Sequence, residues 1–404
     1  MRGLDHERVQ RRRPDRGGRA VDLSRSQEAE RLTIETVLIV GAGPGGLAAA
    51  IALARLGVAV QIVEIEPELT AAGVAVNVQN APLRALATLG VIDDVVRRGH
   101  STATVHLLDA DGVPVAPPLR PAPLVPGYPA SVEVRRMDVA RILEAAALRA
   151  GAAIRYGASV TALEDDGSRV QATFTDGSRG GYDLVIGADG IHSRVRDLVF
   201  GPQDDLLEYS GQCIWRAEAE RGDIDELMML SGPAGKLGLL PLTDERMYVY
   251  LLKDFASPPA RGELGDVDAA LRTALSDFRG PAAGVAERLL PGADFRGLHS
   301  LLMPAPWFRG RVVLIGDAAH ATTPHLAYGL GLAVEDGLVL AESLERADDL
   351  DGALTEFMRR RDDRCRLVVE NSRRLSAWEQ RPPADPAAPG RLMSESMTIL
   401  TSLP

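Results

Sequence analysis

The hydrophobic pattern of the chain becomes regular at residue 36. Residues 36–40 form a continuous β-branched and aliphatic run, which is typical of a strand buried on both faces of a parallel sheet. A glycine-rich stretch follows over residues 41–46, then a helical stretch over 47–56 and, after a stop at Gly57, a second strand over 58–63. This order of strand, helix and strand predicts a βαβ unit, the opening of a doubly wound sheet.

Beyond this unit, helical and strand-like periods alternate along the chain. Val139, Ile142, Leu143 and Ala146 share one helical face, which predicts an amphipathic helix. In chain order, the pattern predicts a helix over 136–149, antiparallel strands over 154–163 and 170–174, a buried strand over 183–186, a β-rich region over about 208–254, mixed loops and helix over 255–300, a buried strand over 311–315 and a long helix over about 331–344.

The two ends of the chain differ in composition from its middle. Residues 1–33 are dense in arginine, including the run over 11–13, and lack an apolar period, so we expect a disordered basic tail. A proline-rich stretch over 382–386 is expected to end the folded part, with a short helix over 391–400. Residues 381–404 are therefore treated as a proline-rich linker and terminal segment.

The composition is that of an ordinary soluble protein, since 46% of its 404 residues are hydrophobic and 25% are charged. The formal charge of −11 disfavours a general nucleic-acid binder, because phosphate binding needs a basic surface. No stretch reaches the roughly 20 mainly apolar residues of a bilayer span. The two cysteines form no disulfide framework, and no pair of the seven histidines has metal-ligand spacing. We expect a reduced, cytoplasmic protein without a metal, nucleic-acid or membrane partner.

The glycine-rich stretch fits a dinucleotide-binding fingerprint at Gly41, Gly43 and Gly46. The first glycine permits a tight turn, the second lets the backbone approach a pyrophosphate, and the third lets the helix pack on the strand. The helix N-terminus then offers free N–H groups to the phosphates. Glu64 ends the second strand, where a carboxylate can bind ribose hydroxyls. The surrounding strand and helix make this match much more specific than glycines alone.

Two later motifs repeat the arrangement of a buried strand that ends in a turn. The strand over 183–186 leads to Asp189, and Ser193 and Arg196 follow at the spacing of a helix start. The strand over 311–315 leads to Asp317, which can accept hydrogen bonds from a polyol chain. Taken alone, Asp189 is as well explained as a helix cap or turn residue.

Together the three motifs resemble the single-component FAD-dependent monooxygenases of the para-hydroxybenzoate hydroxylase type, over about residues 34–375. The resemblance implies an α/β fold: a Rossmann-like FAD-binding domain with an inserted mixed β-sheet substrate domain and C-terminal helices. We assign residues 34–105, 131–205 and 296–380 to the FAD-binding domain with its C-terminal helix, and residues 106–130 and 206–295 to the substrate domain.

The resemblance also implies which residues bind FAD. The residues at the ADP half would be Gly41, Gly43, Gly45, Gly46 and Glu64; Arg136 would also reach FAD, Asp189 would serve the FAD and NAD(P)H regions, Asp317 would bind the ribityl chain, and the segment with Pro324, Gly329 and Gly331 would border the isoalloxazine. Only one dinucleotide fingerprint is present, which fits enzymes that bind NAD(P)H transiently on the FAD domain.

Three positions depart from the family pattern. Ala327 and Gly331 stand where the family often has glycine and asparagine, and Ala75 stands where a second glycine is common. The backbone can still approach the flavin at Gly329 and Gly331. The departures therefore bear on the positioning of the flavin more than on its binding.

In this family the flavin performs the oxygen chemistry, while the protein positions the reactants. NAD(P)H would reduce FAD, oxygen would add to give a flavin hydroperoxide, and the terminal oxygen would pass to an aromatic or polyketide-like small molecule. His325 and Tyr209 are the candidate catalytic residues, and Arg216, Asn77 and Gln79 are further candidates near the substrate. Tyr209 is equally well explained by packing, and His320 by stabilisation of the turn after Asp317.

Two other functions remain open at this point. The same fold performs Baeyer–Villiger insertion when the peroxide attacks a ketone, and a non-catalytic FAD-binding redox protein would carry the same FAD motifs. A flavin halogenase is disfavoured because no WxWxIP motif occurs. We expect a monomer or a homodimer.

Overall fold

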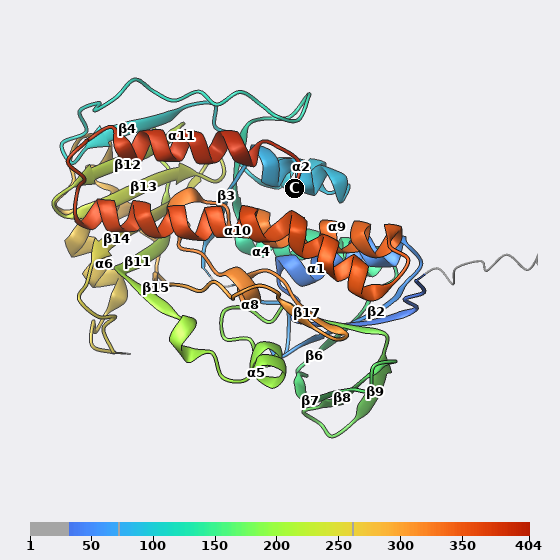
Figure 1. The fold of residues 1–404 in the computed structure, drawn as a ribbon. Helices are drawn as coiled ribbons and strands as arrows, with labels where there is room; N and C mark the ends of the chain where they lie inside the picture. Colours follow the sequence, from blue (N-terminus) through green and yellow to red (C-terminus); the bar gives the residue numbers. More distant parts are fainter. Residues whose placement is uncertain (1–31, 72, 261) are drawn as a thin grey trace, which may run out of the picture.

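Two six-stranded sheets, two smaller sheets and a set of C-terminal helices are the main parts of the structure, a computed structural model that describes residues 32–71, 73–260 and 262–404 (Figure 1). The basic tail expected over 1–33 lies almost wholly outside these residues. The first sheet belongs to the Rossmann-like half and the second to the substrate half. The prediction of an α/β fold with an inserted sheet and C-terminal helices is confirmed.

The first sheet is built around the predicted βαβ unit, in the strand order β16-β17-β10-β1-β2-β6. Five strands are parallel, and β16 is antiparallel at one edge. The central strand β1 is buried from Val37 to Val40, as its aliphatic run predicts. The bounds are β1 (Thr36–Val40), β2 (Ala59–Glu64), β6 (Ala153–Tyr156), β10 (Leu184–Gly187), β16 (Phe308–Arg309) and β17 (Val312–Leu314).

The expected strand over 154–163 is wrong in one respect, because the structure divides it between two sheets. Its first part is β6, which pairs with β2. Gly157 then takes a left-handed conformation (φ 67°) and redirects the chain into a three-stranded sheet of β7 (Val160–Asp165), β8 (Val170–Phe174) and β9 (Arg179–Tyr182). Alternation of polar and apolar residues continues through both parts, so it does not reveal the break.

The second sheet has the order β15-β11-β14-β13-β12-β4. One face packs through Trp215, Leu251 and other apolar residues against Leu271 of a flanking helix, α6. The opposite face, with Tyr248 and Leu240, packs in part on Ala75 of the Rossmann-like half. The bounds are β4 (Val105–Asp109), β11 (Glu208–Glu220), β12 (Leu227–Gly232), β13 (Gly235–Pro241), β14 (Arg246–Asp254), β15 (Asp294–Ser300), α6 (Val267–Leu275) and α7 (Val285–Arg288).

A two-stranded ribbon and several helices connect these halves. The ribbon pairs β3 with β5, so that Asn77 lies opposite Glu133. The bounds are α1 (Pro44–Arg55), β3 (Ala75–Gln79), α2 (Asn80–Thr88), α3 (Ile92–Arg98), β5 (Ser131–Arg135), α4 (Arg136–Arg149), α5 (Arg194–Phe200) and α8 (Asp317–His320), with short 3-10 turns η1 (Asp204–Leu206), η2 (Gly280–Ala282) and η3 (Pro324–Leu326).

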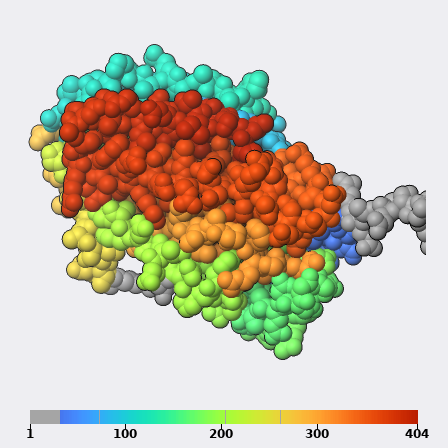
Figure 2. All heavy atoms as spheres, viewed as in Figure 1, coloured from blue at the N-terminus to red at the C-terminus, as the bar shows by residue number. Residues whose placement is uncertain are grey.

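Three C-terminal helices lie across one face of both halves, where Figure 2 shows them as a continuous orange and red layer. They are α9 (Gly329–Arg346), α10 (Leu350–Gln380) and α11 (Ala388–Leu400), so the predicted long helix and terminal helix are both present. The prolines over 382–386 do not end the folded part. They mark a turn after which α11 folds back beside α10, where Leu400 is buried (Figure 1).

Candidate functional site

The turn between β1 and α1 requires glycine at two positions. Gly41 has a left-handed backbone (φ 108°), and a Cβ there would collide with the carbonyl oxygen of Ala188. A Cβ on Gly46 would collide with the carbonyl oxygen of Gly41. Gly43 differs, since a Cβ there would meet nothing within 4 Å. The open side of the turn is therefore at Gly43, which leaves room for a phosphate to reach the N-terminus of α1.

Glu64 lies beside this turn, at the end of β2. Its Oε2 accepts a hydrogen bond from the backbone N–H of Ala42 (2.7 Å), and its Oε1 accepts one from Glu66 (3.0 Å). The carboxylate therefore fixes the turn to the end of the second strand. Each oxygen has a second lone pair that can accept from a ribose hydroxyl.

Arg136, at the start of α4, and Asp317, at the start of α8, come from distant parts of the chain and lie within electrostatic reach of each other. Both side chains keep exposed surface. Surrounding protein nevertheless raises the pKa of Asp317 through burial, which Arg136 opposes, and lowers the pKa of Arg136 through burial and the charge of Arg216. An exposed cation and an exposed anion near each other can hold the phosphate and hydroxyl groups of a large cofactor.

Asp189 holds the start of α5. Its carboxylate accepts from the Ser193 hydroxyl (2.5 Å) and from the backbone N–H of Val195 (3.0 Å). Ser193 in turn accepts from the N–H of Arg196, whose guanidinium donates to the carbonyl of Ala318 (3.0 Å). The second motif is thus connected to the third, and the observed contacts of Asp189 are those of a helix cap.

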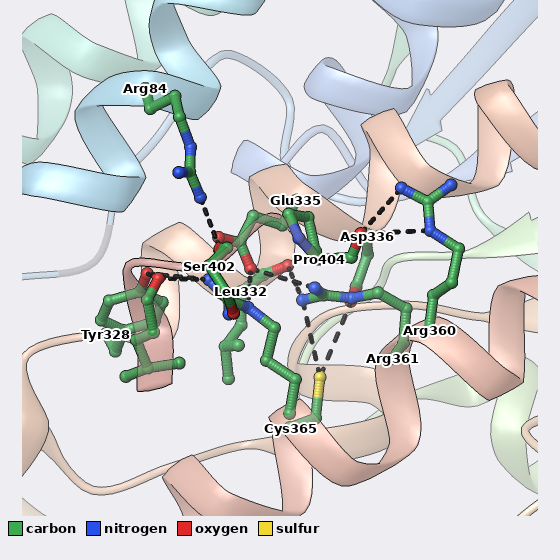
Figure 3. A network of polar contacts seen from close by, with 12 residues as sticks. Arg84, Tyr328, Leu332, Glu335, Asp336, Arg360, Arg361, Cys365, Ser402 and Pro404 are labelled. Carbon is green, nitrogen blue, oxygen red and sulfur yellow. Dashed lines mark hydrogen bonds and ion pairs between the residues drawn. The ribbon is translucent and has the colours of Figure 1, made fainter. Parts of the chain in front are cut away.

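A buried network of ion pairs and hydrogen bonds supports the third motif, which is the turn after β17 (Figure 3). Asp336 accepts from the N–H of Gly316 (2.8 Å) and is hydrogen bonded to His320 Nε2 (2.6 Å). Arg361, which is fully buried, donates to Asp336 (2.7 Å) and Glu335 (3.0 Å). His320 therefore supports the turn after Asp317.

Among the described residues, His320, Asp336 and Cys365 place potential metal-ligand atoms within 4.8 Å of one another. The guanidinium of Arg361 already lies between two of them, with Nη2 3.6 Å from the Cys365 sulfur and Nε on Asp336. This cluster is therefore organised around a guanidinium.

The loop from Pro324 to Gly331 contains Ala327 and Gly331, two of the residues that depart from the family pattern. Ala327 adopts the left-handed conformation (φ 51°) that glycine usually supplies. A Cβ on Gly331 would collide with Pro82, so this glycine allows α2 to approach α9. Gly329 lies against the Thr322 side chain.

His325 is buried within this loop and is fully hydrogen bonded. Its Nδ1 lies 2.9 Å from the Thr323 hydroxyl, and its Nε2 lies 3.0 Å from Gln212 Oε1 and 3.3 Å from Glu379 Oε2. Burial lowers the pKa of His325, although Glu379 acts in the opposite direction. The ring connects the loop to β11 and to α10.

Tyr209 has the contacts of a packing residue. Its hydroxyl donates to the carbonyl of Phe255 (3.0 Å) and lies 3.4 Å from the Cys213 sulfur, and its ring lies against His299. Burial raises its pKa, which disfavours the phenolate that a base would need.

The other three candidate residues, Arg216, Asn77 and Gln79, differ from Tyr209 in their contacts. Arg216 is nearly buried, pairs with Asp294 (Nε–Oδ2 2.8 Å) and packs against Gly73. Asn77 donates to Glu133 and to Ser131, and Gln79 is the residue immediately before α2. The structure thus places Arg216 at the boundary of the two halves and the other two in the ribbon.

Sequence reasoning missed several residues that the fold brings to these sites. Tyr248 lies on the face of β14 toward the Rossmann-like half, within electrostatic reach of Arg136 and Arg216. Gln212 and Glu379 contact His325 from positions 113 and 54 residues away in the chain. No local spacing links these residues, so only the tertiary structure reveals them.

Comparisons with known proteins agree with this geometry. The pattern of the "FAD binding domain" family matches residues 35–372. The chain is 32% identical to 2-heptyl-3-hydroxy-4(1H)-quinolone synthase of Pseudomonas aeruginosa, over 85% of this chain and 90% of that protein. It is 30% identical to the FAD-dependent urate hydroxylase of Klebsiella pneumoniae, over 83% of this chain and 88% of that protein.

A solved structure extends the likeness to the whole fold. The Klebsiella pneumoniae protein HpxO, complexed with FAD and uric acid, superposes with a TM-score of 0.78 at 28% identity, covering 92% of this chain and 97% of that one. In the part of the chain that the structure describes, no helix is long and apolar enough to cross a membrane. Together with the fingerprint turn, these matches establish that the chain belongs to the FAD-dependent monooxygenases of the para-hydroxybenzoate hydroxylase type.

Proposed function

We propose that this protein is an NAD(P)H-dependent monooxygenase that inserts one oxygen atom into a small aromatic or polyketide-like molecule. The observation that carries the proposal is that Arg136 and Asp317 keep exposed side chains within electrostatic reach of each other, in a chain whose fingerprint turn is open at Gly43. FAD, when bound there, supplies the reductive activation of dioxygen.

The cofactor residues are proposed from the same arrangement. The N–H groups around Gly43, with Gly41, Gly45 and Gly46 shaping the turn, would bind the pyrophosphate, and Glu64 would accept from the ribose. Arg136 would neutralise phosphate charge, and Asp317 would accept from the ribityl hydroxyls. Asp189 contributes by holding the start of α5 against the third motif. Pro324, Gly329 and Gly331 would border the flavin ring.

The face of the second sheet toward the Rossmann-like half supports an aromatic substrate. Tyr248 and Tyr250 lie side by side on β14 with ring centroids 5.8 Å apart. Leu240 and Met229 belong to the same apolar cluster as Tyr248, and Arg216 is the cation beside it. Flat rings with few polar groups are bound by such surfaces, because most of the free energy comes from apolar contact.

The first test is reduction of the bound flavin. The purified protein should show the visible spectrum of FAD, and NADH or NADPH should bleach it anaerobically in the presence of urate, a 4-quinolone or simple phenols. A protein that binds FAD but is not bleached under any of these conditions would be the redox protein of the alternative hypothesis. A colourless protein that cannot be reconstituted with FAD would refute the proposal.

The product distinguishes hydroxylation from Baeyer–Villiger insertion. Both add one oxygen atom, so mass alone does not separate them, whereas the carbon connectivity by NMR does. We expect oxygen on a ring carbon with the carbon skeleton intact. Ring expansion or an ester product would establish the insertion reaction instead.

A further inference from the structure

Residues 400–404, which we call the α11 end, contact arginines of two other helices (Figure 3). Arg84 of α2 donates to the carbonyls of residues 401 and 402 (2.7 Å each), and Arg364 of α10 donates to the carbonyl of Leu400 (2.8 Å). The last carbonyls of a helix have no partner within the helix, so cationic donors are favourable there. The α11 end therefore holds α2 and α10 together.

The same contacts reach the loop that leads into α9. Tyr328, the residue before α9, is 2% exposed, and its hydroxyl donates to the carbonyl of Leu400 (3.4 Å). This hydroxyl also accepts from Arg364 (3.2 Å), which in addition pairs with Glu335 of α9 (2.8 Å). Burial raises the pKa of Tyr328, so the hydroxyl keeps its proton and can donate. One buried hydroxyl thus joins the loop to the α11 end and to α10.

The helix α2 connects the ribbon to the same place. It begins directly after β3, and its Pro82 packs so closely on Gly331 of α9 that a Cβ on the glycine would collide with it. Arg84 lies two residues further along α2 and binds the α11 end. The two segments that depart from the family pattern, at Ala75 in the ribbon and over 327–331, are therefore both connected to the α11 end.

The loop needs support from outside, because its own residues hold it weakly. Ala327 has a left-handed backbone (φ 51°), which costs free energy in a residue with a Cβ. Gly329 and Gly331 weaken the first turn of α9, since glycine is a poor helix former. A strained residue persists only where its surroundings determine its conformation. Next to Ala327, the two hydrogen bonds of Tyr328 supply that determination.

We propose that the α11 end positions the loop over 324–331 against the flavin, with Tyr328 and Arg84 as its two points of attachment. This inference rests on the proposed function, which puts that loop beside the flavin ring. Tyr328 acts through the backbone of the loop and is a positioning residue. Release of the α11 end should let the loop adopt other conformations, so the flavin ring loses its fixed orientation. The ADP half of FAD should stay bound at the fingerprint turn.

Hydrogen–deuterium exchange of the FAD-free protein tests the attachment. Arg84→Met removes two hydrogen bonds from the α11 end and leaves the sequence of the loop unchanged. We expect exchange over residues 324–331 to become about threefold to tenfold faster, the effect of losing roughly one hydrogen bond. Tyr328→Phe should in turn accelerate exchange over 398–403, because coupling between two places is reciprocal. Arg84→Lys, which keeps a cationic donor, should exchange at a rate between those of the native protein and Arg84→Met.

Arg55→Met is the matched control. Arg55 of α1 also donates to carbonyls at the end of a helix, those of Thr88 and Leu89 at the C-terminal end of α2 (3.2 and 2.7 Å). Its removal should accelerate exchange near residues 88–91 and leave residues 324–331 at the native rate. The control thus separates loss of any helix-capping arginine from loss of the α11 end.

The orientation of the flavin ring is measured in the FAD-loaded protein. Tyr328→Phe and Arg84→Met should weaken the visible circular dichroism bands of the flavin and lower its fluorescence anisotropy. The dissociation constant for FAD should stay within about threefold of the native value, because the contacts of the ADP half are unchanged. A substitution that only lowers stability would not change the spectrum of the folded, FAD-loaded protein.

The outcomes separate this inference from the proposed function. Native exchange over 324–331 in Arg84→Met would overturn it, as would an equal acceleration in Arg55→Met, which would indicate a general loss of stability. Native circular dichroism bands in both Tyr328→Phe and Arg84→Met would also overturn it, because the loop would then not position the ring. Failure of NAD(P)H to reduce the native flavin would instead overturn the proposed function. The exchange experiment does not depend on that reaction.

Discussion

Replacement of Arg361 by methionine should strongly destabilise the protein. The guanidinium is fully buried and donates to Asp336 (2.7 Å), to Glu335 (3.0 Å) and to the carbonyl of Leu332 (3.1 Å). Methionine fills much of the volume but leaves the Asp336 carboxylate, also fully buried, with one cationic partner fewer. Removing one partner of a buried ion pair costs about 3–5 kcal/mol, because the remaining charge is no longer compensated.

Part of this cost is offset within the network. Arg364 still contacts Glu335 (2.8 Å), and His320 still faces Asp336. We therefore expect a loss near the lower limit, about 3 kcal/mol, in the free energy of unfolding. The turn of the third motif should also lose support, because Asp336 accepts a hydrogen bond from the N–H of Gly316. The affinity for FAD should fall together with stability.

The assay is equilibrium urea unfolding followed by far-UV circular dichroism, with FAD affinity measured by flavin fluorescence. Arg359→Met is the matched control: it lies on the same helix, but its side chain is 70% exposed and pairs with the exposed Glu356. An exposed pair contributes about 0–1 kcal/mol, so the control should unfold nearly as the native protein does. If Arg361→Met and Arg359→Met have the same urea midpoint, the buried network does not stabilise the fold and the reasoning fails.

Three other predictions follow from single positions. Gly46→Ala should lose about 1–3 kcal/mol of stability through collision with the Gly41 carbonyl, whereas Gly43→Ala, which meets nothing within 4 Å, should keep its stability and lose only FAD affinity; urea unfolding and flavin titration of both variants decide this. Ala327→Gly should stabilise the protein by up to about 1 kcal/mol by relieving a left-handed alanine, and an unchanged or lower melting temperature would contradict it. Burial raises the pKa of Glu133 from 4.5 to about 7, so the native state binds a proton that the unfolded state releases, and the stability this proton gives is full below pH 4.5 and disappears as the pH rises through 7. Glu133→Gln should remove that part of the pH dependence between pH 5 and 8 and be the more stable form at pH 8, as urea midpoints at both pH values will show.

The local elements around the first motif follow directly from sequence. A continuous β-branched run, a glycine-rich turn and a helix in succession predict a strand, a tight turn and a helix, and the turn needs residues without a Cβ at Gly41 and Gly46. Three motifs in the family's order then indicated the family, FAD as the cofactor, and a substrate domain inserted between segments of the FAD-binding domain. These conclusions depend on contacts within a few residues, or on the order of motifs.

The contacts of the candidate catalytic residues could not be predicted from the sequence. His325 and Tyr209 have no periodic signal that distinguishes a site from packing, and the structure gives them different environments. The buried His325 contacts Gln212, which is also buried, and Glu379, which is partly exposed, while Tyr209 donates to a main-chain carbonyl. Polar residues far apart in the chain meet only because α10 crosses both halves.

By itself, the sequence determined the βαβ unit and the position of the glycine turn, since both depend on local steric requirements, and the order of three motifs indicated the FAD-dependent family. The tertiary structure alone decided that residues 154–163 belong to two sheets and that the chain beyond the prolines at 382–386 folds back beside α10. It also decided which charges are buried together, as for Arg361 and Asp336. The physical reason is that burial and pairing of charges depend on which distant surfaces meet, and hydrophobic patterning records only that a residue is covered and not by what.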